Sequence, residues 1–155
     1  MLKFLYLLVL FLTIDLSSQN LNNLIVDSSG CSTKLKQIMK PEYPLTDHQG
    51  YAILIFDIDS NGGLKNTKIK ESMCVTERNE EGSIIFRKCP FFKNKTLIAS
   101  KYMKFSNPQD VAGNSCEIID HEHRFTFSRY AINVQDNNFI LRDEYLSKNK
   151  NDKDK

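Results

Sequence analysis

The densest run of strand-forming residues in the chain extends from Tyr51 to Ile58. Nearly every position in it is β-branched, aromatic or aliphatic, which is typical of a strand that is covered on both faces. Successive side chains of a strand point to opposite faces, so the run divides into two sets. One set is Ala52, Leu54, Phe56 and Ile58, and the other is Tyr51, Ile53 and Ile55. The pattern predicts an internal strand around which the other elements are arranged.

A turn and a more polar strand follow this run. Residues 57–63 supply acid, Asn and paired Gly, which tolerate positive φ angles and close hairpins. Residues 64–70 are strand-forming but more polar, as expected of a strand that returns along the first. We therefore expect a β-hairpin.

The same turn also matches the first half of an EF-hand calcium loop, through Asp57, Asp59, Asn61 and Gly62. The match ends there, because the last position of that loop requires a bidentate acid and Lys68 stands at it. The flanking residues also have the pattern of strands and not of helices. We favour a plain hairpin with solvated carboxylates over a calcium site.

Two segments have apolar residues at helical spacing. In the first, residues 32–40, the apolar residues are followed by Pro41, which predicts a short helix that ends there. In the second, Pro90 suits the first position of a helix. The apolar stripe of this helix consists of Phe92, Thr96, Ala99 and Met103. We expect it to pack against one face of the hairpin.

A further strand and a polar tail complete the pattern. Residues 117–132 alternate again, with Phe125 and Phe127 on one face, which indicates a half-buried strand. Residues 146–155 are mostly charged or Asn, and we expect them to be disordered. The order strand, strand, helix, strand predicts an α+β fold: a small antiparallel three-stranded sheet with helices packed on one face.

The first eighteen residues have the form of an export signal. Lys3 precedes an apolar core at residues 4–14, and Ser18 ends a plausible cleavage region. The core is shorter than the ~20 apolar residues that a spanning helix needs. We expect cleavage and export, and the alternative is an uncleaved anchor that attaches the chain to the membrane.

An exported chain with an even number of cysteines is expected to form disulfides. The chain has Cys31, Cys74, Cys89 and Cys116, for which three pairings exist. We prefer Cys74 with Cys89, because they flank a segment that reads as a second small hairpin. Cys31 and Cys116 are then left to form the other pair.

The residues offer little catalytic or metal chemistry. His121 and His123 would point to one face of the last strand with Glu122 opposed to them, but a third ligand is missing. No motif supplies an activated nucleophile. The net charge of +2 is too small to indicate a nucleic-acid surface. We expect no enzyme, no cofactor, no metal and no nucleic-acid partner.

The motifs and their order resemble the C-terminal domain of TonB, the energy-transducing protein of the Gram-negative periplasm. A Tyr-Pro pair precedes the first strand, a Gly turn follows it, a Ser closes the return strand, and a helix and a last strand come afterwards. The residues that carry the resemblance are Tyr43, Pro44, Phe56, Ile58, Asp59, Gly62, Leu64, Asn66, Ile69, Ser72, Phe92, Ala99, Met103, Phe105, Pro108, Phe125 and Phe127.

The resemblance implies a β-β-α-β core and a division of the chain. Residues 1–18 would be the signal peptide, 19–40 a leader with the short helix, and 41–132 the TonB-like domain. A disulfide-bounded insertion at 73–89 lies within that domain, and 133–155 would be a charged extension that is disordered at its end.

The resemblance also implies a function in transmembrane transport. A periplasmic domain of this kind would bind an outer-membrane TonB-dependent transporter, or another envelope protein, by adding a peptide strand to its last strand. The residues of that edge are His123, Arg124, Phe125, Thr126, Phe127, Ser128, Arg129 and Tyr130. No Pro-rich spacer follows the apolar leader. Energy transduction therefore stays open, as does the alternative of an exported, disulfide-stabilised structural or adhesion domain. The oligomeric state is open too.

Overall fold

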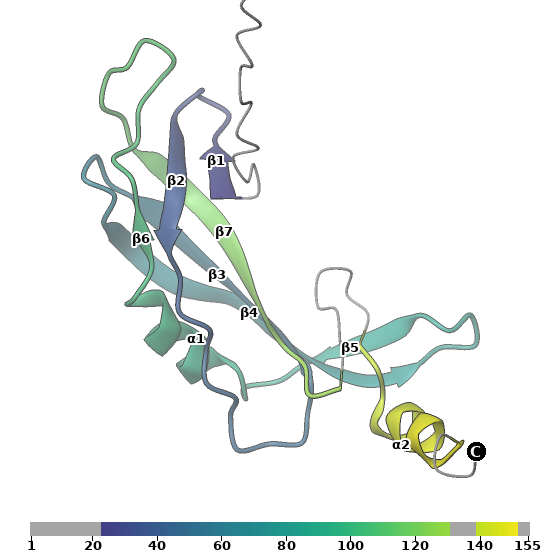
Figure 1. Cartoon of the computed structure of the whole chain (residues 1–155). Helices are drawn as coiled ribbons and strands as arrows, with labels where there is room; N and C mark the ends of the chain where they lie inside the picture. The colour runs from purple at the N-terminus through teal and green to yellow at the C-terminus, as the bar shows by residue number, and fades with distance from the viewer. Residues whose placement is uncertain (1–22, 131–138, 152–155) are drawn as a thin grey trace, which may run out of the picture.

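The computed structural model describes residues 23–130 and 139–151, so the predicted signal peptide and the start of the leader lie outside the described residues. Within these ranges the chain forms two antiparallel sheets and two α-helices (Figure 1). The elements are β1 (Leu24–Val26), β2 (Ser32–Gln37), β3 (Gly50–Ile58), β4 (Leu64–Arg78), β5 (Ile84–Lys88), α1 (Lys93–Ser100), β6 (Lys104–Phe105), β7 (Ile118–Phe127) and α2 (Arg142–Asn151). The predicted α+β class is confirmed.

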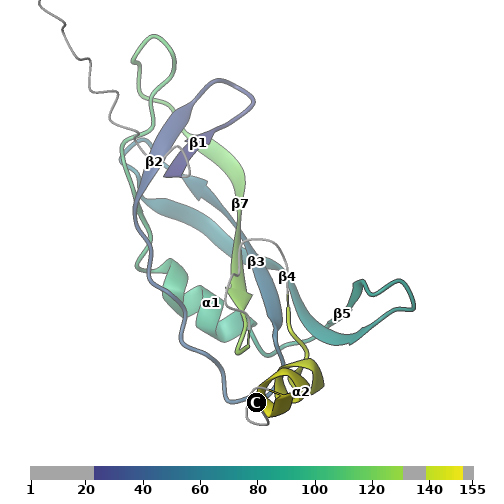
Figure 2. The same cartoon turned by 45° about the vertical axis from the view of Figure 1, so that its right-hand side comes forward.

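The main sheet has four strands in the order β5-β4-β3-β7. The predicted central strand is β3, and it pairs antiparallel with β4 on one side and β7 on the other. The three strands predicted from the sequence are therefore neighbours, but they belong to a sheet of four. The fourth strand is β5, because β4 continues to Arg78 and the second hairpin extends the same sheet as an arm directed away from α1 (Figure 2).

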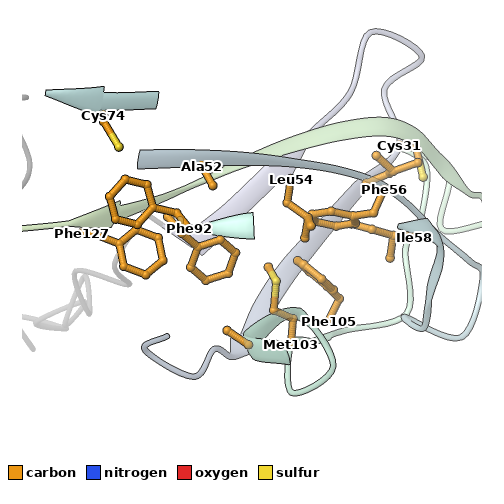
Figure 3. Close-up of a cluster of buried hydrophobic side chains, with 13 residues drawn as sticks. Cys31, Ala52, Leu54, Phe56, Ile58, Cys74, Phe92, Met103, Phe105 and Phe127 are labelled. Atoms are coloured by element: carbon orange, nitrogen blue, oxygen red, sulfur yellow. The ribbon is translucent and has the colours of Figure 1, made fainter. Parts of the chain in front are cut away.

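The two faces of β3 differ as the alternation predicts. Ala52, Leu54, Phe56 and Ile58 are at most 1 % exposed, whereas Tyr51, Ile53 and Ile55 are half-buried. The buried face contacts the predicted stripe of α1, whose members Phe92, Thr96, Ala99 and Met103 are all buried. Figure 3 shows Phe92 against Phe127 at one end of this core, and Met103 and Phe105 near Leu54 and Phe56 at the other.

Helix α1 begins at Lys93 and not at Pro90 as predicted. Residues 91 and 92 form a turn in which the N–H of Lys93 donates to the carbonyl of Pro90. The tight turn lets Phe92 enter the core before the helix starts.

The turn between β3 and β4 uses its carboxylates for backbone hydrogen bonds. Oδ1 of Asp59 accepts from the N–H groups of Asn61 and Gly63, each at 2.9 Å. Asp57 accepts from Asn66 Nδ2 at 2.5 Å and from the N–H of Asp120 at 2.8 Å. These bonds organise a hairpin as predicted.

The second sheet corrects one prediction. It has the order β1-β2-β6. Residues 32–37 form β2, so the short helix expected at 32–40 is wrong. Thr33 is 3 % exposed and its Oγ1 donates to the carbonyl of Ser106 at 2.5 Å. Pairing with β1 and β6 outweighs the weak helical pattern of so short a segment.

Both expected disulfides are present. Cys74 bonds to Cys89 with the Cα atoms 5.7 Å apart, and Cys31 bonds to Cys116 with the Cα atoms 6.1 Å apart. The first closes the β4–β5 hairpin, whose turn has Gly82 at φ 81°. The second ties the start of β2 to the segment before β7. Two disulfides are consistent with an exported chain.

The C-terminal extension is more ordered than its composition predicts. Helix α2 includes residues 146–151, for which we expected disorder, and residues 152–155 lie outside the described ranges. Phe139 is 2 % exposed and packs edge-on against Phe86 at 5.7 Å. Arg78 forms an ion pair with Glu144 at 2.5 Å and donates to the carbonyl of Phe139 at 2.9 Å. These contacts hold the extension against the β4–β5 arm.

Candidate functional site

Strand β7 is an edge strand. Among the described residues its ladder partner is β3, and it ends the order of the main sheet. The pairing runs without interruption from Gly50 opposite Phe127 to Phe56 opposite His121. The register shifts only beyond that point, near Asp120, whose φ is 53°. An edge of this kind presents unpaired backbone groups that another strand can join.

A groove of about 390 Å³ accompanies this edge. One wall is the chain segment that follows β2, and the other is the middle of β7. The lining residues are Ile38, Met39, Lys40, Pro41, His123, Arg124, Phe125 and Thr126. Sequence reasoning missed most of the first wall, because it assigned Ile38, Met39 and Lys40 to a helix that ends before Pro41. Pro41 was the available signal, since its fixed φ favours an extended path.

The side chains of β7 that face the core hold the strand in position. Phe127 stacks on Phe92 with ring centroids 4.5 Å apart and meets Tyr43 edge-on at 6.1 Å. Phe125 is 4 % exposed and contacts the His123 ring edge-on at 4.7 Å. These contacts fix the backbone of the edge independently of any ligand.

The outer face of β7 carries charges that lie across the sheet. The guanidinium of Arg124 stands 3.7 Å from the centre of the Tyr51 ring. Its Nε and Nη2 atoms are buried and have no hydrogen-bond partner among the described residues. Glu122 pairs with Lys70 of β4 at 2.5 Å. Because these side chains lie over β3, they do not cover the backbone edge of β7.

The two histidines lie on the core side of the strand. Burial, and secondarily the charge of the nearby His121, lowers the pKa of His123 to about 4. Burial also lowers the pKa of His121, whose ring meets Phe56 edge-on at 5.3 Å. Both rings are therefore neutral near pH 7. In the described part of the chain, no group of three His, Cys, Asp or Glu is placed to hold a metal.

The strand ends earlier than predicted. Residues 128–130 do not continue the ladder, so the expected edge from His123 to Tyr130 is shortened to end at Phe127. Oε1 of Gln49 accepts from the Ser128 hydroxyl at 3.0 Å and from the Arg129 N–H at 3.1 Å. The Tyr130 ring stacks on Tyr145 of α2 at 4.8 Å. The buried Gln49 thus turns the chain away from the sheet, and nothing in the local sequence pattern signals this.

The residues of the Tyr-Pro motif lie at the end of β7. Pro44 is buried, and the Tyr43 hydroxyl donates to the carbonyl of His48 at 2.7 Å. Arg129 lies over the Tyr43 ring, 4.8 Å from its centre, and donates to the carbonyl of Thr46 at 2.8 Å. The motif therefore supports the end of the edge strand.

The other two motif residues lie away from this edge. Gly62 has φ 80°, and a Cβ atom there would come within 2.6 Å of the carbonyl oxygen of Phe105, so it serves the hairpin turn. Ser72 is 4 % exposed on β4, and its hydroxyl has no hydrogen-bond partner in the described ranges.

The comparisons with known proteins identify no family for the chain, and the helices give no further indication. No family model, curated protein or solved structure matches the chain. Each helix in residues 23–130 and 139–151 is too short or too polar to cross a membrane.

Proposed function

We propose that the chain is an exported, periplasmic protein-interaction module that binds an extended segment of another envelope protein by strand addition at β7. The observation that carries the proposal is the combination of an uninterrupted edge ladder with a groove directly beside it. In strand addition the peptide backbone supplies the affinity, and the pockets along the edge supply the specificity.

The dimensions of the edge suit a short peptide. The uninterrupted pairing covers residues 121–127, which at ~3.3 Å per residue corresponds to roughly 23 Å of strand. Ile38 and Met39 offer apolar contacts to alternate side chains of such a peptide. The neutral His123 adds no charge to the groove at neutral pH.

The partner that we propose is an outer-membrane TonB-dependent transporter, for a function in transmembrane transport. The support is the order of the motif residues, together with the two disulfides that suit an exported chain. We expect neither catalysis nor a cofactor. Attachment to the membrane would depend on retention of the N-terminal apolar segment.

The test is a titration of a fluorescent peptide taken from the periplasmic N-terminus of such a transporter. Thr126→Ala should leave the affinity nearly unchanged, because the side chain is not the binding element. Thr126→Pro should weaken binding strongly, since proline removes a main-chain donor and cannot serve a ladder position. Circular dichroism must show that each variant is folded.

A second series changes the peptide and leaves the protein intact. Backbone N-methylation at alternate peptide positions should abolish binding in one register and spare it in the other, because only every second residue bonds to the edge. Binding that is insensitive to both N-methylation and a folded Thr126→Pro would refute strand addition. Absence of binding to any transporter segment would favour the alternative, an exported, disulfide-stabilised structural or adhesion domain.

A further inference from the structure

The opposite side of the main sheet has a second free edge. Strand β5 pairs with β4 only from Met73 to Arg78, and the carbonyl of Ser72 accepts from the Cys89 N–H at 2.9 Å, so in the described structure residues 64–71 of β4 have no strand on their outer side. Helix α1 packs against β4 and β3 there, next to β4 in Figure 1. Helix α1, packed on the face of the sheet, therefore borders this edge, whereas an extended segment borders the β7 edge.

Two pockets lie in line between β4 and α1. The first, of about 400 Å³, is lined by Ile69, Lys70, Glu71, Ser72, Lys88, Cys89, Pro90 and Lys93. The second, of about 720 Å³, is lined by Gly63, Leu64, Thr67, Leu97, Ser100, Lys101 and Met103. The first joins the end of this stretch of β4 to the start of α1, and the second joins its beginning to the helix end. We call the combined surface the α1 groove.

Three lysines border the α1 groove without carboxylate partners. Lys88, Lys93 and Lys101 are exposed, and none forms an ion pair with a described residue. Elsewhere on the same elements Lys95 pairs with Glu42, and Lys65 pairs with both Asp59 and Glu117, whereas Lys68 of β4 forms no ion pair with a described residue. Uncompensated positive charge thus gathers at this groove.

The other two charged residues of the lining point to the opposite face of the sheet. The Lys70 ammonium bonds to Glu122 of β7 at 2.5 Å. The carboxylate of Glu71 interacts with Tyr51, whose pKa is raised by burial and by this hydrogen bond. The residues that line the two pockets therefore present three positive charges and no carboxylate to a ligand.

A polar side chain in the same place also lacks a partner. Ser72 lines the first pocket and is 4 % exposed, and its Oγ has no hydrogen-bond partner within the described residues. A buried hydroxyl without a partner costs free energy. Because the Ser72 Oγ is almost wholly inaccessible, it marks the polar floor of the first pocket and is not itself a contact for a ligand.

The backbone of this edge does not offer a regular ladder. The register of β4 shifts around Lys70 and again between Lys65 and Lys68, where Asn66 has φ 51°. Bulges and lysines are the usual means by which an edge strand resists pairing with another strand. A ligand of the α1 groove must therefore be bound mainly through its side chains.

We propose that the α1 groove binds a short, extended, acidic segment of a partner protein, separately from the ligand of β7. Charge complementarity selects this occupant: its carboxylates would meet Lys88, Lys93 and Lys101, and its apolar side chains would enter the pocket beside Leu64 and Leu97. A second copy of the chain would present the same lysines. A nucleic acid would lack stacking partners, because no aromatic residue lines either pocket.

The test uses a fluorescein-labelled peptide of about eight residues that alternates glutamate and valine, a length set by the rise of an extended strand along this stretch of β4. Fluorescence anisotropy at low salt should show binding, and a matched peptide that alternates lysine and valine should not bind. Lys88→Glu and Lys93→Glu should each weaken binding about threefold, and the double variant about tenfold.

Lys36→Glu is the matched control, because Lys36 is an exposed lysine of β2 outside both pockets. Lys36→Glu should leave the affinity for the acidic peptide unchanged, although it alters the net charge by as much as Lys88→Glu or Lys93→Glu does. Folded Thr126→Pro should also bind the acidic peptide normally, which separates this site from the β7 edge.

Three outcomes would overturn the proposal. The first is no binding of the acidic peptide. The second is equal weakening by Lys36→Glu and Lys93→Glu, which would mean non-specific attraction. The third is tighter binding of a single-stranded oligonucleotide, or a dimer in sedimentation that the Lys93→Glu variant dissociates, since either would assign the groove to another occupant.

Discussion

The two edges of the main sheet both have backbone groups without a strand partner, but they differ in regularity and in the element that lies beside them. At β7 the ladder is regular and the neighbouring segment, residues 38–41, stands off and leaves a groove. At β4 two bulges interrupt the pairing with β3, α1 lies alongside, and three exposed lysines border the groove between them. A regular edge can accept a backbone, whereas an interrupted edge can accept side chains only. One sheet can thus offer two kinds of binding surface.

The largest effect should come from the side chain that supports both edges. Phe92 precedes α1 and stacks on Phe127 of β7, so Phe92→Ala should destabilise the fold by about 3–5 kcal/mol, the usual loss for a buried ring. Urea unfolding measures this change. Lys101→Ala, at the exposed C-cap of the same helix, should leave the free energy of unfolding nearly unchanged. Similar small losses in both variants would contradict the assigned buried face.

The next largest loss of stability should come from removal of the disulfide that closes the β4–β5 hairpin. Replacing Cys74 and Cys89 by serine opens a loop of 15 residues, which in the chain-entropy model costs roughly 3 kcal/mol. The core residues should keep the fold intact, and peptide binding at β7 should persist. Thermal unfolding together with the β7 titration measures both. Loss of binding at β7 with the fold retained would show that the two edges are coupled.

A change of the free energy of unfolding with pH should come from a histidine of β7. The pKa of His123 is about 4 in the folded chain, against an ordinary value of 6.5. The unfolded chain therefore takes up a proton first as the pH falls. The associated stability is complete above pH ~6.5, declines below it, and should be reduced by about 1–2 kcal/mol at pH 5. Urea unfolding from pH 7 to pH 5 measures it.

The replacement of His123 tests this cause. His123→Phe should reduce the pH dependence, and a smaller part should remain from His121, whose pKa is also lowered by burial. An unaltered slope in His123→Phe would remove this histidine as the cause.

The smallest effect should come from the ion pair that joins the two edges across β3. Lys70 and Glu122 are both exposed, so solvent and salt screen their attraction. A double-mutant cycle with Lys70→Ala and Glu122→Ala should give a coupling that is weaker than any effect above and that vanishes at high salt. A strong, salt-independent coupling would contradict the exposed character of the pair.

Local patterns predicted those parts of the molecule in which neighbours in sequence decide the structure. The alternation in β3 assigned its buried and half-buried faces, because side-chain direction in a strand follows position alone. Turn residues such as Gly62 and Gly82 marked both hairpins, because positive φ angles suit glycine. The hairpin at Cys74 and Cys89 also indicated the disulfide pairing.

Only the tertiary structure decided the rest, because distant partners outweigh weak local preferences. Residues 32–37 became a strand through bonds to β1, β6 and Ser106. Phe139 is buried because it packs against Phe86 of the β4–β5 arm. The groove beside β7 and the end of that strand depend on residues 38–41 and on Gln49, which lie far from β7 in the chain. No periodicity in β7 encodes them, since burial and hydrogen bonds between remote segments form only when the whole chain packs.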